Sequence, residues 1–320
     1  MQRDDGTRTV LLAGATGTIG QATARALLEA GHDVTCLVRP GRAGALPAGV
    51  RAVEADVTDR DALAAVGDFG AVVSCLASRT GAPAEAWAVE HRAQSNLLAR
   101  AREAGAQPFV LLSAICVQKP LLEFQKAKLA FERELAASGL AHAIVRPTAF
   151  FKSLSGQAGR VRAGRPFLLF GDGALTSCKP VSDRDLAAYL VRCLEDASLH
   201  GRVLPIGGPG PALTPREQGE ALFAAFGKPP SFRHVPVALI DGIAGGLALL
   251  GRANARMADR AEFARIGRYY ATESMLVLDP ATGRYDADAT PETGRDTLPD
   301  FYRRLAAGEA TVDLGEHAVF

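Results

Sequence analysis

The stretch Thr9-Val-Leu-Leu-Ala-Gly-Ala-Thr-Gly-Thr-Ile-Gly20 decides the fold of this chain. A short apolar run leads into a turn that carries glycine at every third position, and an amphipathic segment follows. Because glycine has no Cβ, it allows a sharp strand-to-helix turn, a close approach of the backbone to an anion and tight packing of the helix on a sheet. The helix N-terminus then offers N–H groups and a positive dipole end to a phosphate. The cofactor-contacting residues that this dinucleotide-binding pattern predicts are Gly14, Thr16, Gly17, Thr18, Ile19 and Gly20.

The first 150 residues alternate short apolar runs with longer amphipathic segments. The runs are rich in Val, Leu and Ile, as expected of strands buried on both faces. Strand and helix in alternation imply right-handed βαβ crossovers, so we predict an α/β fold, a Rossmann-type doubly wound parallel sheet with a smaller C-terminal substrate region. The predicted strands are residues 9–13, 34–38, 51–54, 71–75, 109–113 and 143–145, and the predicted helices are 19–30, 59–66, 85–104 and 122–138.

The composition is that of a folded protein without a highly charged partner. Hydrophobic residues make up 48% of the 320 positions, and the formal net charge is +1 with no basic tract, which argues against a nucleic acid partner. The five cysteines are not closely spaced, so we expect free thiols and no metal site. The polar segment Met1–Gly6 shows no signal peptide, so we expect a cytoplasmic protein.

The second predicted strand ends at Val38, and the next residue is Arg39. An enzyme that uses NAD usually places a carboxylate here for the ribose 2′-hydroxyl, and that carboxylate would repel a 2′-phosphate. An arginine instead pairs with the 2′-phosphate through charge-assisted hydrogen bonds. Arg42 is near enough in sequence to join it, so we predict NADPH as the cofactor. The alternative is that Arg39 is a solvated loop residue.

Three further segments follow predicted strands and are placed at the cofactor by their position in such a fold. The pair at 56–57 lies where the adenine binds, although Asp56 is equally consistent with a helix cap. The segment 76–78 lies near the phosphates and ribose. The proline turn at 146–151 would border the nicotinamide, or its aromatic residues belong to the core. The additional predicted cofactor contacts are Asp56, Val57, Leu76, Ala77, Ser78, Pro147, Thr148 and Phe150.

The spacing G-x-x-G-x-x-G resembles the extended and atypical branches of the short-chain dehydrogenase/reductase superfamily. That superfamily places a Tyr and a Lys four residues apart on one helix face, where the Lys binds the nicotinamide ribose and the Tyr exchanges a proton with a substrate oxygen. Here Lys128 is kept as the candidate catalytic residue, and it also counts as a cofactor contact, whereas Phe124 stands at the Tyr position. Phenylalanine has no proton to give, which disfavours ketone or alcohol chemistry and favours reduction of a conjugated C=C bond. The alternative is that Lys128 is an ordinary surface lysine.

The resemblance becomes specific in the stretch Leu111-Leu-Ser-Ala-Ile-Cys-Val-Gln-Lys-Pro-Leu-Leu-Glu-Phe-Gln-Lys-Ala-Lys128. This stretch is similar to the signature of the NADPH-dependent divinyl (proto)chlorophyllide 8-vinyl reductases, which are atypical short-chain dehydrogenases/reductases. Matching blocks continue at 146–155, 170–173, 176–180, 182–185 and 262–275. The resemblance implies hydride transfer from NADPH to the 8-vinyl group of a magnesium tetrapyrrole in (bacterio)chlorophyll biosynthesis. Plant members carry a plastid transit segment that is not seen here, which points to a bacterial source.

We expect residues 1–150 to form an NADP-binding Rossmann domain and residues 151–320 to form a substrate-binding region interleaved with the last strands of the sheet. The apolar stretch Val235–Leu250 is too short to span a bilayer and is consistent with a core helix, a pocket wall or a surface that touches the photosynthetic membrane. The block at 262–275 is consistent with a segment that contacts the propionate or the ring of the substrate. It is equally consistent with a solvated basic helix beside core aromatic residues. The residues in question there are Arg265, Arg268, Tyr269 and Tyr270.

The sequence does not assign the donor of the proton that completes the reduction, for which Cys116, Lys119 and Lys152 are candidates. Two other functions stay open. One is another atypical short-chain reductase acting on a small enone or imine, and the other is a non-catalytic NADP-binding sensor or accessory subunit.

Overall fold

The computed structural model of the chain describes residues 7–251 and 254–312 and divides into two compact units. Unit 1 consists of Met1–Ser78, Ala84–Pro147 and Asp183–Pro205, and unit 2 consists of Arg79–Pro83, Thr148–Ser182 and Ile206–Phe320. The chain therefore leaves unit 1 after β6 and returns to it for a helix and a strand. The segment Met1–Gly6, in which we expect no signal peptide, lies outside the described residues.

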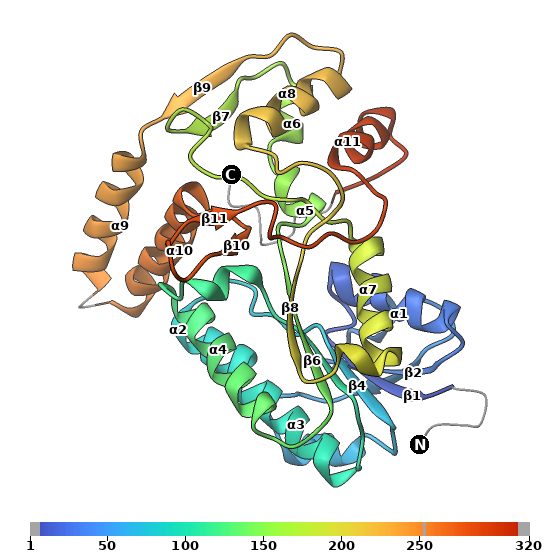
Figure 1. The fold of residues 1–320 in the computed structure, drawn as a ribbon. Coiled ribbons are helices and arrows are strands. Elements are labelled where there is room, and N and C mark those ends of the chain that lie inside the picture. Colours follow the sequence, from blue (N-terminus) through green and yellow to red (C-terminus); the bar gives the residue numbers. More distant parts are fainter. Residues whose placement is uncertain (1–6, 252–253, 313–320) are drawn as a thin grey trace. The chain divides into compact units, whose positions relative to one another are not determined.

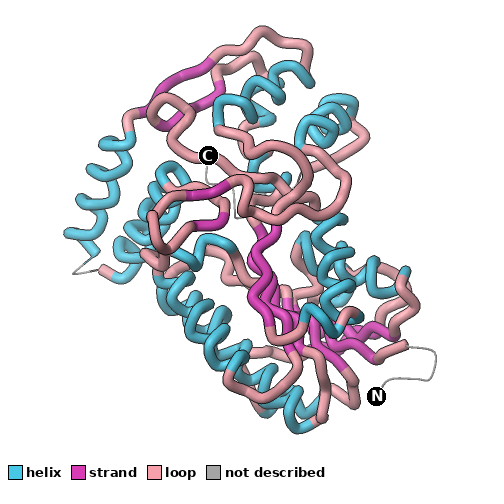
Figure 2. Tube along the Cα trace, in the orientation of Figure 1, coloured by secondary structure: helices cyan, strands magenta, loops and turns pink. Residues whose placement is uncertain are grey.

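Unit 1 is built on a seven-stranded sheet with the order β3-β2-β1-β4-β5-β6-β8 (Figures 1 and 2). β1 pairs in parallel with both β2 and β4, so the strand order reverses at β1. Ligands of such sheets bind beyond the carboxyl ends of the strands at this reversal. The predicted α/β fold is confirmed. The strands are β1 (Thr9–Ala13), β2 (Asp33–Val38), β3 (Arg51–Glu54), β4 (Ala71–Ser74), β5 (Phe109–Leu112), β6 (His142–Pro147) and β8 (Arg202–Ile206).

Helices cover both faces of this sheet, with α1 packed against α7 on one face and α4 packed against η3 on the other (Figure 1). A core of buried aliphatic and aromatic side chains, including Leu11, Val72, Leu97 and Phe131, fills unit 1. Burial of each such side chain contributes roughly 1.5–3 kcal/mol to stability. The helical segments are α1 (Thr18–Glu29), η1 (Ala43–Ala45), η2 (Asp61–Ala65), α2 (Pro83–Ala86), η3 (Trp87–Ala93), α3 (Gln94–Glu103), η4 (Ile115–Gln118), α4 (Glu123–Ala136), α7 (Asp183–Glu195) and η5 (Ala197–Leu199).

Two of the predicted helices differ from those observed. The helix predicted at 59–66 is only a 3₁₀ turn at Asp61–Ala65, because the chain has just left an Asx-type turn at Asp56. The helix predicted at 85–104 contains a π-helical segment, η3, between α2 and α3. The hydrogen bonds of a π-helix join residues five apart, one more than in an α-helix.

Unit 2 contains two small sheets and its own core. β7 pairs with β9 in parallel, β10 pairs with β11 antiparallel, and Val161, Leu169, Phe223 and Tyr302 lie among the buried core residues. The elements are α5 (Phe151–Leu154), α6 (Ala158–Arg162), β7 (Phe167–Phe170), α8 (Pro215–Ala225), β9 (Phe232–Val235), α9 (Val237–Gly251), α10 (Ala255–Thr272), β10 (Val277–Leu278), β11 (Tyr285–Asp286) and α11 (Leu298–Ala307).

The apolar stretch Val235–Leu250 forms most of helix α9, which packs against α10 (Figure 1). Four of its large side chains are exposed: Leu239 is 56%, Ile243 51%, Leu249 64% and Leu250 60% accessible. The interpretation as a core helix is therefore wrong. Within the part of the chain that the structure describes, every helix is too short or too polar to cross a bilayer.

Candidate active site

The turn after β1 has no room for side chains at two of its three glycines. Gly14 has a φ of +78°, and a Cβ there would lie 2.4 Å from the Cys75 carbonyl oxygen. A Cβ on Gly20 would lie 2.1 Å from the Gly14 carbonyl oxygen, so α1 packs directly on the turn. Gly17 is exposed, and a Cβ there would lie 3.4 Å from the same oxygen, which is ordinary contact. Gly14 and Gly20 thus fix the shape of the turn, and Gly17 leaves its outer side open.

The start of α1 fits an anionic group. Gly17 is the N-cap residue, so no side chain caps the helix, and its first turn contains no acidic residue. The first N–H groups of a helix have no partner within it, and the dipole there is positive. Thr16 and Thr18 are half-buried beside this end, whereas Ile19 is buried. The turn therefore suits a dinucleotide pyrophosphate, with Ile19 offering its backbone rather than its side chain.

Arg39 and Arg42 are both exposed and lie in the same turn after β2. In this turn the Arg42 N–H donates a hydrogen bond to the Arg39 carbonyl at 3.1 Å. Beyond β3, the Asp56 carboxylate accepts hydrogen bonds from the Thr58 hydroxyl and N–H at 2.7 and 2.9 Å. These bonds, with a smaller effect of the Arg39 charge, hold the pKa of Asp56 below its usual value. Asp56 therefore fixes its own turn, while the Val57 side chain belongs to the core.

One buried carboxylate joins the loop after β4 to helix α4. Glu90 Oε1 accepts hydrogen bonds from the Ser78 N–H and hydroxyl at 2.8 and 2.9 Å, and Glu90 Oε2 lies 2.7 Å from Lys128 Nζ. Lys128 is 9% exposed, so it is a buried lysine and not an ordinary surface residue. In the same loop Leu76 packs against the core and Ala77 is exposed. The structure thus brings the predicted residues Ser78 and Lys128 together.

A second polar group lies next to this one in unit 1. Ser113, at the end of β5, donates to Glu132, which also accepts from Arg146 Nε at 3.1 Å. The Ser74 hydroxyl donates to Gln94 Oε1 at 2.8 Å. Members of both groups, namely Glu90, Gln94, Ser113 and Lys128, lie close together with Leu111 and Phe131. Buried polar groups of this kind are held in one geometry, because burying a polar group costs free energy unless it keeps a hydrogen-bond or ion-pair partner.

The candidate proton donors differ in accessibility. Phe124 is buried one turn before Lys128 on α4, as the four-residue spacing predicts. Cys116 is buried in η4, and Lys119 just after it is exposed. Lys152 lies in α5 of unit 2 and is half-buried. Phenylalanine at 124 leaves this face of α4 without an acid at the usual position.

The segment after β6 passes from unit 1 to unit 2. Pro147 is buried at the end of β6. The Thr148 N–H donates to the Ile206 carbonyl at 2.9 Å, and its hydroxyl donates to the Lys179 carbonyl. Phe150 is half-buried and takes part in a β-bridge. Thr148 and Phe150 thus make their contacts inside unit 2, and their contact with a nicotinamide stays a prediction.

Two basic residues of α10, Arg265 and Arg268, already have carboxylate partners. Arg265 Nη1 lies 3.0 Å from a glutamate one turn earlier, and Arg268 pairs with Asp241 of α9. Tyr269 is buried, whereas Tyr270 is 42% exposed, and their rings meet edge to face at 5.8 Å. A substrate carboxylate would have to compete for either arginine, and Tyr270 is the tyrosine of this pair with an open ring.

The five cysteines are free thiols. Burial raises the pKa of the Cys36, Cys178 and Cys193 thiols to about 12, so these three stay protonated at neutral pH. Across residues 7–251 and 254–312, no group of His, Cys, Asp and Glu side chains is arranged to hold a metal ion.

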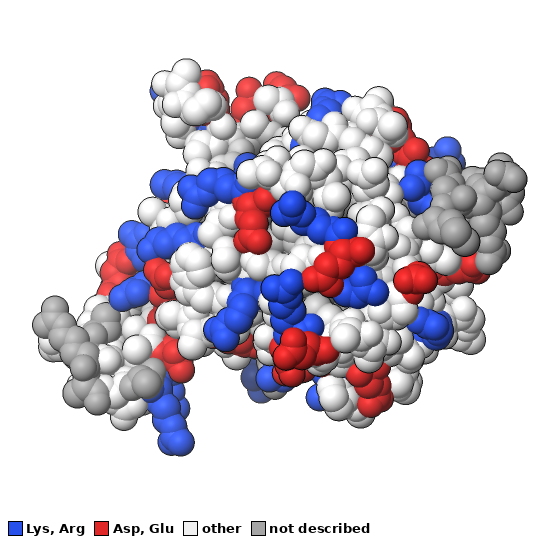
Figure 3. Space-filling model, turned by 90° about the horizontal axis from the view of Figure 1, so that it is seen from below, with Lys and Arg blue, Asp and Glu red and all other residues white. Residues whose placement is uncertain are grey.

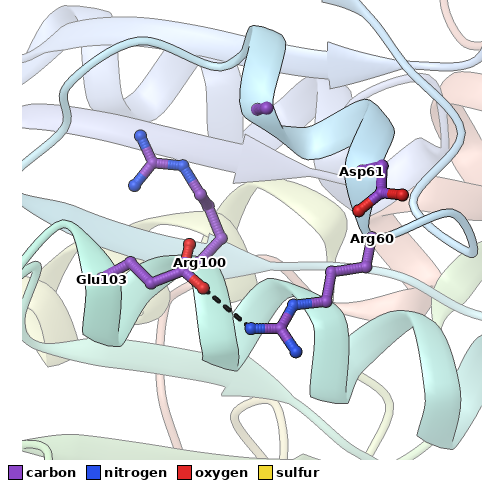
Figure 4. A pocket seen from close by; sticks show the side chains of 5 residues that line it. Arg60, Asp61, Arg100 and Glu103 are labelled. Atoms are coloured by element: carbon purple, nitrogen blue, oxygen red, sulfur yellow. Dashed lines mark hydrogen bonds and ion pairs between the residues drawn. The ribbon is translucent and has the colours of Figure 1, made fainter.

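Arg60 and Arg100, which line a surface pocket of unit 1, both have partners. A surface pocket of about 370 Å³ lies between η2 and α3 (Figure 4). There Arg60 pairs with Glu103 at 2.9 Å, and the Arg100 guanidinium stacks over the Phe69 ring. Figure 3 shows Lys and Arg interspersed with Asp and Glu on one face of the molecule, the distribution expected at a net charge of +1. The pocket therefore offers a dinucleotide no unengaged positive charge.

The NAD(P)H-binding family matches residues 14–197, more than half of the chain. A rice protein (Oryza sativa subsp. indica) named divinyl chlorophyllide a 8-vinyl-reductase, chloroplastic, is 50% identical over 98% of this chain and 82% of its own length. The chain belongs to the divinyl chlorophyllide a 8-vinyl-reductase family. A (4-alkanoyl-5-oxo-2,5-dihydrofuran-3-yl)methyl phosphate reductase of Streptomyces griseus is 32% identical over 71% of this chain and 77% of its own length. An NADPH-dependent quinone oxidoreductase of Escherichia coli, solved with NADPH, shares the fold with a TM-score of 0.67 at 20% identity, covering 92% of this chain and 99% of that one.

Sequence reasoning missed Glu90. The signal was present, because Ala86, Ala93 and Leu97 are buried at helical spacing and Glu90 falls on the same face. A carboxylate on the buried face of a helix requires a partner, and a buried lysine is one of the few side chains that can supply it. Reading Glu90 together with Lys128 would have identified the pair.

Proposed function

We propose that this chain reduces the 8-vinyl group of divinyl chlorophyllide or protochlorophyllide to an ethyl group with NADPH. The observation that carries the proposal, within this family, is a buried lysine at 128 with phenylalanine one turn before it. NADPH, when bound, supplies a hydride. The vinyl group takes up that hydride and one proton, and the negative charge in between spreads into the conjugated macrocycle. The substrate therefore needs no acid at the position of Phe124.

The residues of unit 1 would hold the cofactor in the manner that their geometry supports. The open side of the glycine turn and the start of α1 bind the pyrophosphate, and Arg39 and Arg42 pair with the 2′-phosphate. Lys128 donates to the nicotinamide ribose. We further propose that unit 2 forms the substrate-binding region, in which a magnesium tetrapyrrole lies with its acidic edge toward basic side chains.

The direct test mixes the purified chain with NADPH and divinyl chlorophyllide a in the dark and follows the Soret band. We expect a shift to the shorter wavelength of the monovinyl product, a much slower shift with NADH, and none with Lys128→Ala. If NADPH binds and the band does not move, the tetrapyrrole is not the substrate. Turnover of a small enone in the same cuvette would then assign the chain to the smaller-substrate reductases, and its absence would favour a non-catalytic NADP-binding role.

We also propose that α9 makes peripheral contact with a lipid surface. Its exposed leucines and isoleucine form an apolar face on a helix too short to cross a bilayer, as in helices that lie in the membrane interface. Arg256 and Arg260 are exposed on the adjoining α10, where they can meet anionic headgroups.

Flotation with vesicles of phosphatidylglycerol and phosphatidylcholine tests this contact. We expect the chain to float with the anionic vesicles and the double variant Leu249→Gln/Leu250→Gln to stay behind. Leu121→Gln is the matched control, because Leu121 is equally exposed but lies in unit 1. Equal flotation of the double variant and the wild type would exclude α9 as the contact.

A further inference from the structure

We propose that Glu90 is the positioning residue of the active site, which fixes the Lys128 ammonium and the Ser78 loop relative to each other. The inference rests on the proposed function, in which both of these groups face the cofactor. The Glu90 side chain, in η3, thereby determines where the Lys128 ammonium group lies.

The geometry of Glu90 supports a double role. Its two carboxylate oxygens are divided between the two partners, with Oε1 accepting both Ser78 hydrogen bonds and Oε2 pairing with Lys128 at 2.7 Å. The three residues come from three different elements, namely the loop after β4, η3 and α4. A movement of any one of these elements therefore reaches the other two through this carboxylate.

Burial makes the arrangement specific. Glu90 is 2% and Lys128 9% exposed, so each charge has the other as a partner in a place that bulk water hardly reaches. A lysine side chain has four rotatable bonds and no fixed direction of its own, in contrast to the planar arginine fork. A buried partner on one side restricts Lys128 to the rotamers that keep Nζ beside Glu90. π-Helical segments are frequent at functional sites, and Glu90 lies in one.

Helix α4 provides a matched control for this pair. Glu132 follows Lys128 by one turn and is also buried, but it contacts Ser113 and Arg146. Glu132→Gln therefore removes a buried carboxylate from the same polar region without removing the partner of Lys128. Both Glu90→Gln and Glu132→Gln remove the charge of a buried carboxylate, but only Glu90→Gln removes the charged partner of the Lys128 ammonium.

The first experiment compares Glu90→Gln, Lys128→Met and the double variant by thermal unfolding without NADPH. Lys128→Met leaves the Glu90 charge buried and unpaired, so we expect the double variant to unfold at a higher temperature than Lys128→Met alone. The matched double variant Glu132→Gln/Lys128→Met should instead unfold at a lower temperature than Lys128→Met. Additive losses in both double variants would overturn the pairing.

The second experiment measures the emission of bound NADPH and single-turnover reduction in the same variants. Glu90→Gln should lower the rate of hydride transfer roughly 10–100-fold while changing the Kd for NADPH less than about threefold, because the lysine is misplaced and not removed. In the Lys128→Met background, Glu90→Gln should change neither the emission of bound NADPH nor its Kd any further. Equal rates in Glu90→Gln and the wild type would overturn the proposal.

Failure of the proposed function has a different signature. A wild-type chain that binds NADPH and never reduces the tetrapyrrole contradicts the function. The role of Glu90 is then decided by the emission of bound NADPH, which Glu90→Gln and Lys128→Met should change in the same direction without adding to each other. An emission that responds to Lys128→Met and not to Glu90→Gln would overturn the role of Glu90.

Discussion

Two segments of this chain are rich in glycine for opposite physical reasons. In the turn after β1, a Cβ on Gly14 or Gly20 would lie within 2.4 Å of a backbone oxygen. In helix α9, a Cβ on Gly242, Gly245 or Gly246 would meet nothing within 4 Å. The turn needs glycine because two backbone segments nearly touch, whereas α9 carries glycine where space is free. Glycine content alone therefore does not distinguish a constrained turn from an open helix.

The surroundings of the two segments differ in the same way. Helix α1 buries one face in unit 1, including Ile19, Ala24 and Leu27, and its N-terminus is left uncapped by side chains. Helix α9 carries one charged residue, Asp241, among apolar ones and leaves Leu239 and Leu249 exposed. Function at the turn depends on backbone shape, whereas function at α9 depends on the side chains that it presents. Substitutions in the two segments should therefore change different measurements.

Gly20→Ala should have the largest effect. The added Cβ would lie 2.1 Å from the Gly14 carbonyl oxygen, and neither backbone can yield without separating α1 from β1. We expect a loss of about 3 kcal/mol or more in the free energy of unfolding, measured by urea denaturation followed by circular dichroism. NADPH binding should be lost with it.

Gly17→Ala is the control for that change, because its Cβ would lie at an ordinary 3.4 Å from the same oxygen. The variant should fold with nearly unchanged stability and bind NADPH more weakly, since the methyl group occupies the open side of the turn. Equal stability losses in Gly17→Ala and Gly20→Ala would show that the turn is constrained differently from this description.

Arg39→Ala should have an intermediate effect that is confined to the cofactor. Loss of a charge-assisted contact with the 2′-phosphate should raise the Kd for NADPH about 10-fold, equivalent to about 1.4 kcal/mol, and leave the Kd for NADH unchanged. Fluorescence titration with each cofactor measures both values. Arg60→Ala is the matched control, because Arg60 is also exposed but pairs with Glu103 (Figure 4). An equal loss of affinity for NADPH and NADH in Arg39→Ala would contradict the assignment.

The sequence was sufficient for most of the sheet, because parallel strands that are buried on both faces appear in the sequence as short apolar runs. The predicted strand 9–13 agrees with β1 at both ends, and the strand predicted at 51–54 agrees with the edge strand β3, although three of its four residues are exposed. The π-helical segment η3 was not predicted, because the buried residues from 86 to 97 have the spacing of an ordinary α-helix. The exposure of α9 could not be predicted either, since the sequence of an apolar helix is the same whether or not its neighbours cover it.

Among the candidate site residues, those fixed by local geometry were easiest to identify. Gly14 and Gly20 have a requirement that lies within seven residues of chain and one neighbouring strand. Lys128 was identified by spacing, but its burial and its pairing with Glu90 depend on three elements meeting in space. Roles that depend on contacts between elements distant in the sequence cannot be assigned from a single sequence pattern.

Gly245→Ala should have the smallest effect and the opposite sign to Gly20→Ala. Its Cβ meets nothing within 4 Å, and alanine is the better helix former, so we expect the free energy of unfolding to rise by about 0.5–1 kcal/mol. Gly251→Ala, in the same helix, should lower it, because its Cβ would lie 2.9 Å from Ala258 Cα of α10. Thermal unfolding of both variants, followed by circular dichroism, compares an open and a closed position on one helix. A loss of stability in Gly245→Ala would mean that another surface covers α9 at that position. The two glycine-rich segments would then differ in what packs against their glycines, and not in whether the space beside them is free.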